Sequence, residues 1–132
     1  MDRALDAIDG VVSCVKDSVV HVFSDERLFD LEVALVEVLT NAVRHGQPTV
    51  PGQRIGVEVD LDGTDITLTV HDTGAALPVD LFEVAPPLDE VDPMAERGRG
   101  LSLVVKMADR VRVLPQVGNN RIELTFSGKA RP

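Results

Sequence analysis

The sequence predicts an α+β fold, a two-layer α/β sandwich with helices on one face of a mostly antiparallel sheet. Three observations lead to this class. Two segments with apolar residues at helical spacing open the chain, a pair of alternating apolar and polar segments follows, and a third helical segment precedes a second alternating pair. Such elements bury their apolar sides against one another in layers. At 132 residues, positions 1–132 are expected to form one domain with its own core.

The charge balance limits the classes of partner. The chain has 13 Lys and Arg against 22 Asp and Glu, a net charge of −9. This argues against binding nucleic acid, because neutralising phosphates along a strand requires clustered basic side chains. It does not exclude a nucleotide, which a few backbone N–H groups and one metal ion can hold.

The N-terminal region and the cysteine content indicate a compartment. The first ten residues carry Asp2, Asp6 and Asp9 where a signal peptide would be basic, and no apolar stretch is long enough to span a membrane. The single Cys14 lies in an apolar helical pattern, so we expect a buried core thiol. A soluble, cytoplasmic protein that does not bind membranes is predicted.

Two helices are predicted in the first third of the chain. The first covers residues 4–22, although Gly10 interrupts it, and its apolar residues are Leu5, Ile8, Val12, Val15, Val19 and Val22. Ser24-Asp25-Glu26 is typical of a helix start, and the second helix runs from about Arg27 to His45. Its apolar stripe, expected to pack on the sheet, consists of Leu31, Leu35, Val38 and Ala42.

A β-hairpin follows these helices. Residues 54–61 and 65–71 both alternate apolar and polar side chains, and Asp62-Gly63 between them marks a tight turn. One face of this hairpin is expected to face the core.

The remaining segments complete the order αα-ββ-α-ββ. Residues 79–97 contain three prolines and read as a long loop, a feature that is usually functional in a compact domain. Gly98-Arg99-Gly100 is expected to open a third helix over residues 101–108. Strands are predicted at 110–114 and 121–126, joined by a turn at Gly118-Asn119-Asn120.

Three polar or glycine-containing clusters are candidates for a functional site. Glu37, Asn41 and His45 stand four residues apart beside the apolar stripe, so they share one helix face. Asp72-Thr-Gly74 follows a predicted strand directly, and Gly98-x-Gly100 precedes a helix. Each cluster alone also has a structural interpretation, as a solvated helix rim, a turn and a flexible helix entry respectively.

The order of the clusters is more specific than any one of them. A helix with Glu and Asn four apart, a hairpin that ends in Asp-x-Gly, and a long loop that closes on Gly-x-Gly-Leu resemble the nucleotide site of the GHKL superfamily. The resemblance covers about residues 27–126. The chain is most similar to the bacterial anti-sigma-factor serine kinases, in the segments Val36-Glu-Val-Leu-Thr-Asn-Ala-Val-Arg-His-Gly46, Arg97-Gly-Arg-Gly-Leu-Ser-Leu103 and Ala108-Asp-Arg-Val111.

The resemblance implies the GHKL (Bergerat) ATP-binding fold and a role for each candidate residue. Asn41 would give its carboxamide oxygen to a Mg²⁺ ion that bridges the ATP phosphates. Glu37 would orient or deprotonate the attacking hydroxyl. Asp72 would accept a hydrogen bond from the exocyclic amine of adenine, and Gly74 would let the backbone approach the base.

The third helix would hold the phosphates. Gly98, Gly100 and Leu101 would offer backbone N–H groups at its positive end. Arg97 and Arg99 are further candidates for phosphate contacts, with solvent-facing positions at a loop end as the alternative. Residues 79–97 would form a lid over the nucleotide.

Two departures from the family pattern concern the lid and the sheet edge. Many superfamily members have a second Gly at the position of Ala76, which bears on the geometry of the lid. Anti-sigma kinases generally begin with a short strand, whereas here the helical pattern begins almost at Met1, so an edge strand is expected to be missing.

The function that the resemblance implies is that of an anti-sigma factor and serine/threonine protein kinase. Such a protein would bind Mg·ATP, sequester a sigma factor as a homodimer, and phosphorylate a serine on a small STAS-type antagonist. A detached histidine-kinase ATP-binding domain is one alternative, although no phosphoacceptor box surrounds His21. A nucleotide-sensing binding module without phosphotransfer is another, but such a module has no need of the Glu37 carboxylate.

Overall fold

The computed structural model describes residues 1, 4–45, 54–72, 96–116 and 119–128, and for His45 and residues 96–99 it describes the backbone alone. A 3-10 turn at Leu5–Ala7 precedes the helices and strands. These are α1 (Ile8–Val19), α2 (Asp25–His45), β1 (Gly56–Asp62), β2 (Asp65–Asp72), α3 (Glu96–Met107), β3 (Arg110–Leu114) and β4 (Asn120–Ser127). The predicted order αα-ββ-α-ββ is confirmed.

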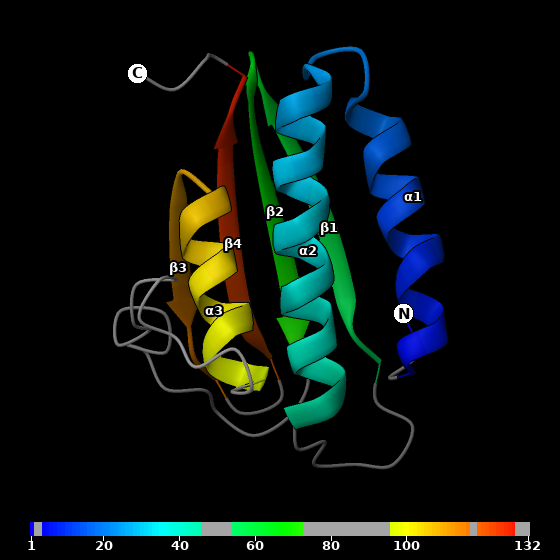
Figure 1. The fold of residues 1–132 in the computed structure, drawn as a ribbon, viewed down its shortest axis with the longest axis vertical. Helices are drawn as coiled ribbons and strands as arrows, with labels where there is room; N and C mark the ends of the chain where they lie inside the picture. The colour runs from blue at the N-terminus through cyan, green and yellow to red at the C-terminus, as the bar shows by residue number, and fades with distance from the viewer. Residues whose placement is uncertain (2–3, 46–53, 73–95, 117–118, 129–132) are drawn as a thin grey trace.

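The four strands form one sheet in the order β1-β2-β4-β3, and all three pairings are antiparallel. Figure 1 shows the three helices on the same face of this sheet, with α2 between α1 and α3. The predicted two-layer α+β architecture is therefore correct. Among the described residues, no helix combines the length and hydrophobicity needed to cross a lipid bilayer.

The core lies between the helices and the two central strands. Alternate residues of β2 and β4 point toward the helices and are buried, namely Ile66, Leu68, Val70, Ile122, Leu124 and Phe126. The predicted apolar stripe of α2 meets them, because Leu31, Leu35, Val38 and Ala42 are all buried as well. Aliphatic side chains thus supply most of the buried surface, and burying each of them contributes roughly 1.5–3 kcal/mol.

Helix α1 is shorter than predicted, and one of its side chains lies on the other face. Its buried residues are Ile8, Val12, Val15 and Val19. Cys14 is exposed, so the expectation of a buried thiol was wrong. The reason is the helical period: a residue adjacent to Val15 is rotated by about 100° from the buried stripe.

Helix α2 starts where its sequence predicts a cap. The Ser24 Oγ accepts a hydrogen bond from the Arg27 N–H at 3.2 Å, as an N-cap serine does three residues before the donor. Asp25 and Glu26 lie in the first turn, where negative charge complements the helix dipole. The helix therefore begins two residues earlier than the predicted start at Arg27.

Strand β1 forms one edge of the described sheet and is less covered than predicted. Its hairpin turn contains Gly63 at φ +63°, a conformation that glycine adopts without steric cost. Val59 and Leu61 face the helix side but remain 37% and 48% exposed. Next to this strand, Met1 and Ile55 exchange two backbone hydrogen bonds, at 2.6 and 2.8 Å. The start of the chain thus lies against the segment that leads into β1.

Helix α3 begins at Glu96, five residues before the predicted start at Leu101. Gly98, Arg99 and Gly100 therefore lie inside the helix instead of opening it, and the predicted loop 79–97 overlaps its first two residues. The two glycines lower helix propensity, which is why sequence reasoning placed the boundary later. The rest of that loop lies outside the described residues.

Candidate functional site

The predicted site residues come from three elements that meet at one end of the domain. Figure 1 shows that the C-terminal ends of α2 and β2 and the N-terminal end of α3 lie at the same end of the molecule. Glu37 and Asn41 belong to α2, Asp72 is the last residue of β2, and Gly100 lies in α3. Clusters that are about 30 residues apart in the sequence are thus brought to one region.

Gly100 lies directly against the polar face of α2. A Cβ atom at Gly100 would stand 2.6 Å from Glu37 Oε2 and 3.3 Å from Asn41 Nδ2. Gly100 is buried, whereas Glu37 and Asn41 beside it are half-buried and therefore partly accessible to solvent. The absence of a side chain at position 100 is what gives the carboxylate and the carboxamide room beside α3.

The N–H groups of α3 differ in their availability. In an α-helix, the first four N–H groups have no intrahelical acceptor. Gly98 lies within that group of a helix that begins at Glu96, whereas Gly100 and Leu101 lie in the second turn. Leu101 is buried and belongs to the hydrophobic core. The amide of Gly98 therefore suits an anion better than those of Gly100 and Leu101, whose phosphate contacts stay a prediction.

Asp72 lies at a polar junction between β2 and β4. Asp72 is 2% exposed, and its partner in the strand register, Asn120, is fully buried. The Asn120 Nδ2 donates a long hydrogen bond of 3.4 Å to the Asp72 carbonyl, and its Oδ1 accepts one of 3.0 Å from the Gln116 N–H. The Asn120 carboxamide thereby ties the end of β2 to the turn before β4.

Some predicted site residues are not described. Gly74 and Ala76 lie outside the described residues, as does nearly all of the predicted lid. Arg97 and Arg99 lie in the first turns of α3, but their side chains are also outside the description. Their roles remain predictions.

Two residues with buried polar contacts were not recognised from the sequence. Asn120 was assigned only to a turn, yet it is the buried partner of Asp72. Arg27 was taken as the first residue of a helix, yet it is 5% exposed and makes a network of polar contacts. A signal for Arg27 was present, because it precedes Leu31 by four residues and Val38 by eleven and so shares the buried stripe of α2.

The donor set around Glu37 fits a metal ion that is shared with a nucleotide. A carboxylate and a carboxamide supply hard oxygen ligands of the kind that Mg²⁺ prefers. Within the described residues there is no group of three His, Cys, Asp or Glu side chains that could hold a metal ion. Mg²⁺ usually binds one or two protein groups together with substrate phosphates, which agrees with this sparse set.

Comparison with known proteins identifies the family. A model of the histidine kinase-like ATPase domain matches residues 3–126, nearly the whole chain. The chain belongs to the histidine kinase-like ATPase domain family. The resemblance to GHKL ATPases that the three clusters indicated is confirmed, and ATP is the nucleotide that this family is named for.

Individual relatives carry names from sigma-factor regulation. The anti-sigma F factor of Pasteuria penetrans is 32% identical over 99 residues, which cover 74% of this chain and 65% of the relative. That of Geobacillus stearothermophilus is 30% identical and covers 70% and 63%. The serine-protein kinase RsbW of Oceanobacillus iheyensis is 30% identical, with 73% and 63% covered. The chain therefore spans just under two thirds of the length of these relatives.

Solved structures support the fold. The mycobacterial sensor histidine kinase MprB matches with a TM-score of 0.60 and 22% identity over 99% of this chain and 97% of that one. The histidine kinase domain of an Erythrobacter litoralis blue-light activated kinase matches with a TM-score of 0.57 and 18% identity, over 78% of this chain and 45% of that one. At these identities, the two structures are similar to this chain in fold alone.

Proposed function

We propose that this protein is an Mg·ATP-dependent serine/threonine protein kinase that also acts as an anti-sigma factor. The observation that carries the proposal is the juxtaposition of Glu37 and Asn41 on α2 with Gly100 on α3. It unites a carboxylate, a carboxamide and the second turn of a helix in an ATPase-family fold. The names of relatives at about 30% identity support the choice of kinase and anti-sigma factor within that family.

Glu37 is proposed to act on the hydroxyl of the substrate serine. Its half-buried carboxylate can accept the hydroxyl hydrogen and direct the oxygen toward the γ-phosphate of ATP. Phosphoryl transfer needs little covalent help from the protein, so correct placement of the nucleophile supplies much of the rate. The O–H bond of serine breaks, its oxygen bonds to phosphorus, and ADP leaves with the electrons of the cleaved P–O bond.

Asn41 is proposed to hold the metal, one helical turn after Glu37 on the same face. The Mg²⁺ ion would neutralise part of the phosphate charge. The unpaired N–H groups at the start of α3, including that of Gly98, would bind phosphate oxygens from the other side. The two helices would thus hold the phosphates between them.

Asp72 is proposed to select adenine. A carboxylate at the end of β2 can accept a hydrogen bond from the exocyclic amine, which guanine lacks at the corresponding position. The burial of Asp72 and the contact from Asn120 hold the strand end in place, which supports a specific recognition role.

The proposed partners are a sigma factor and a small STAS-type antagonist that carries the phosphorylated serine, with the kinase acting as a homodimer. Phosphorylation would add about −1.5 to −2 charges to the antagonist. Added to a surface that faces a chain of net charge −9, this charge would weaken the complex and free the kinase for the sigma factor.

The experiment that tests the proposal is a pull-down from the source cell, run with Mg·ATP and with Mg·ADP and followed by phosphosite mapping. We expect a sigma factor among the captured proteins, together with a small protein phosphorylated on serine with ATP only. Capture of a regulator that never acquires a phosphate would support a nucleotide-sensing module. A histidine phosphosite would support a detached histidine-kinase domain, and absence of any regulator would reject partner switching.

Substitutions in α2 test the roles proposed for Glu37 and Asn41. Glu37→Gln should retain ATP binding and lose phosphotransfer, whereas Asn41→Ala should lose Mg-dependent binding of ATP. The matched control is Glu32→Gln, on the same helix, where the carboxylate pairs with Lys16 of α1 at 3.0 Å. It should leave both measurements unchanged. A fully active Glu37→Gln variant would remove Glu37 from the chemistry.

A further inference from the structure

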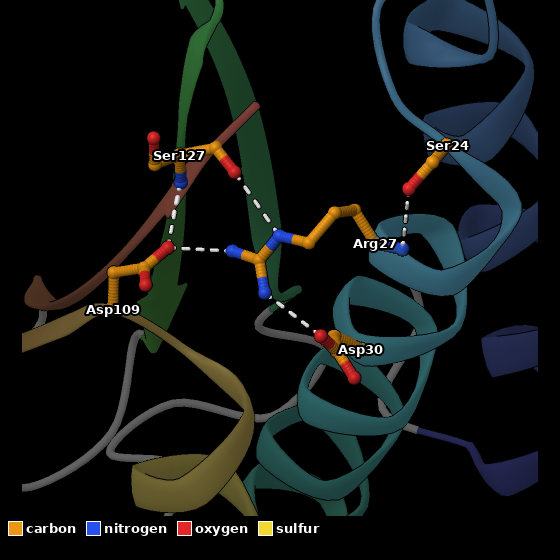
Figure 2. A network of polar contacts seen from close by, with 5 residues as sticks. All are labelled: Ser24, Arg27, Asp30, Asp109 and Ser127. Carbon is orange, nitrogen blue, oxygen red and sulfur yellow. Dashed lines mark hydrogen bonds and ion pairs between the residues drawn. The ribbon is translucent and has the colours of Figure 1, made fainter. Parts of the chain in front are cut away.

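The network around Arg27 lies in the helix layer at the end opposite the candidate site. The Arg27 side chain is 6% exposed, and its guanidinium lies over the rings of Phe23 and Phe126, with centroid distances of 5.9 and 5.7 Å. Burying a guanidinium is costly unless its N–H groups find acceptors. Figure 2 shows that this one reaches three of them, on Asp30, Asp109 and Ser127.

Two of these acceptors belong to parts of the chain outside α2. The Arg27 Nη2 donates to Asp109 Oδ2 at 2.5 Å, and its Nε donates to the Ser127 carbonyl at 3.0 Å. The same Asp109 oxygen accepts the Ser127 N–H at 2.6 Å, and the Asp109 N–H donates to the Thr125 carbonyl at 2.9 Å. Asp109 follows the last residue of α3 by two positions. The guanidinium therefore joins the start of α2 to the end of α3 and to β4.

The third acceptor is different. Arg27 Nη1 donates to Asp30 Oδ2 at 2.7 Å, and both residues lie in the first turns of α2. An ion pair between positions i and i+3 supports the helix locally but connects it to no other element. Arg27 therefore makes one carboxylate contact within α2, with Asp30, and one that joins α2 to the end of α3, with Asp109.

Helices α2 and α3 contact each other at two places, through Arg27 with Asp109 and through Glu37 with Gly100. α2 and α3 run in opposite directions side by side (Figure 1), with Arg27 near Asp109 at one end and Glu37 against Gly100 at the other. Ten residues of α2 separate Arg27 from Glu37, about 15 Å at 1.5 Å per residue. A slide of α3 along α2 must change both contacts together.

We infer that Arg27 is a positioning residue for the candidate site, acting through Asp109. Its planar guanidinium fixes the end of α3 relative to α2 in one orientation, which a more flexible contact would not do. The axial position of α3 then sets how close Gly100 and the first turn of the helix come to Glu37 and Asn41. The effect on activity rests on the proposed kinase function, whereas the effect on helix position does not.

The experiment compares Asp109→Asn with Asp30→Asn in the full chain. Each variant removes one carboxylate from Arg27, and Asp109→Asn also weakens the acceptor of the Ser127 N–H. A merely stabilising role would therefore lower the Tm, more in Asp109→Asn than in Asp30→Asn, and would change neither local exchange at Gly100 nor kcat/KM. We expect Asp109→Asn alone to speed amide hydrogen exchange at Gly100, Leu101 and Ser102 in the nucleotide-free protein. In the same variant kcat/KM for phosphotransfer should fall at least about tenfold, because a misplacement of about 1 Å can cost about 100-fold. Asp30→Asn should stay within about twofold.

The readouts separate the inference from the proposed function. Exchange and kinetics are measured well below the Tm of each variant, so that both stay folded. If the unmodified protein transfers no phosphate, the proposed function fails, and hydrogen exchange still decides the role of Arg27. Equal exchange at Gly100 in the two variants would overturn the inference, as would equal kcat/KM at equal folded fraction in an active kinase.

Discussion

Gly100 shows how a missing side chain can define a polar site. Its contacts are the very carboxylate and carboxamide that sequence reasoning had assigned to chemistry and metal binding. The expected reason for this glycine was a backbone N–H group offered to phosphate. The geometry adds another reason, since any side chain at position 100 would compete with Glu37 for space.

Gly100→Ala should preserve the fold and impair the chemistry. Alanine is favoured over glycine within a helix by about 0.5–1 kcal/mol, and the Glu37 carboxyl is the end of a flexible side chain that can move away. The displaced carboxylate should lower kcat at least about tenfold, because placement of the nucleophile supplies much of the rate. Circular dichroism and a kinase assay on the same preparation check this.

Gly10→Ala is the matched control for this change. Gly10 also lies inside a helix, but a Cβ there would meet nothing within 4 Å. This variant should gain about 0.5–1 kcal/mol of stability and keep full activity. An active Gly100→Ala variant would show that the position of the Glu37 carboxylate is not critical.

Asn120→Ala should weaken both stability and ATP binding. The variant removes the acceptor of the Gln116 N–H and one hydrogen bond to the buried Asp72 residue, and losing a hydrogen-bond partner costs a buried polar group about 1–3 kcal/mol. Asn119→Ala is the control, because that side chain is exposed and contacts only the ring of His71 in the described structure. Urea denaturation and titration with ATP measure the two effects. Equal losses in both variants would exclude Asn120 from the proposed adenine site.

The helices show which local signals carry over into the folded chain. The Ser24 cap forms as its sequence predicts, and the buried stripe of α2 follows the helical period. The third helix does not follow its local signals, since two glycines within its first turns suggested a later start. Packing against α2 overrides the propensity of about 1 kcal/mol that each glycine costs.

Ser24→Ala should destabilise the protein by about 1 kcal/mol, because the Arg27 N–H loses its side-chain acceptor. Ser13→Ala, in the exposed middle of α1, is the control and should change stability by less than about 0.5 kcal/mol. Chemical denaturation checks both. The same loss in both variants would show that the cap contributes nothing specific.

A nucleotide bound between α2 and α3 is expected to stabilise the whole domain. Binding between α2 and α3 would join elements that otherwise meet through the core, Gly100 and the Arg27 network. A ligand that binds only the folded state stabilises that state in proportion to the logarithm of its concentration.

Mg·ATP at about 100 times its Kd should therefore raise stability by about 2.7 kcal/mol, or the Tm by about 10 °C for a domain of this size. Addition of EDTA should remove most of this shift if Asn41 binds the ATP through the metal. Differential scanning calorimetry provides the measurement, with Asn41→Ala as the comparison. A shift that survives EDTA would contradict the metal role of Asn41.

Much of the fold was determined by the sequence itself. The order of the elements, the limits of β3, the hairpin turn at Gly63 and the buried stripe of α2 follow from periodicity and turn chemistry, which are local. The family likewise followed from the order of three short clusters, and a match over residues 3–126 confirms it.

Only the tertiary structure decided how these elements meet. The exposure of Cys14, the start of α3 at Glu96, the contact of Gly100 with Glu37 and the burial of Arg27 against Asp109 all depend on packing. Each involves residues that are distant in sequence or a choice between the two sides of a helix. Local patterns encode which residues share a face, but the neighbour that covers this face comes from another part of the chain.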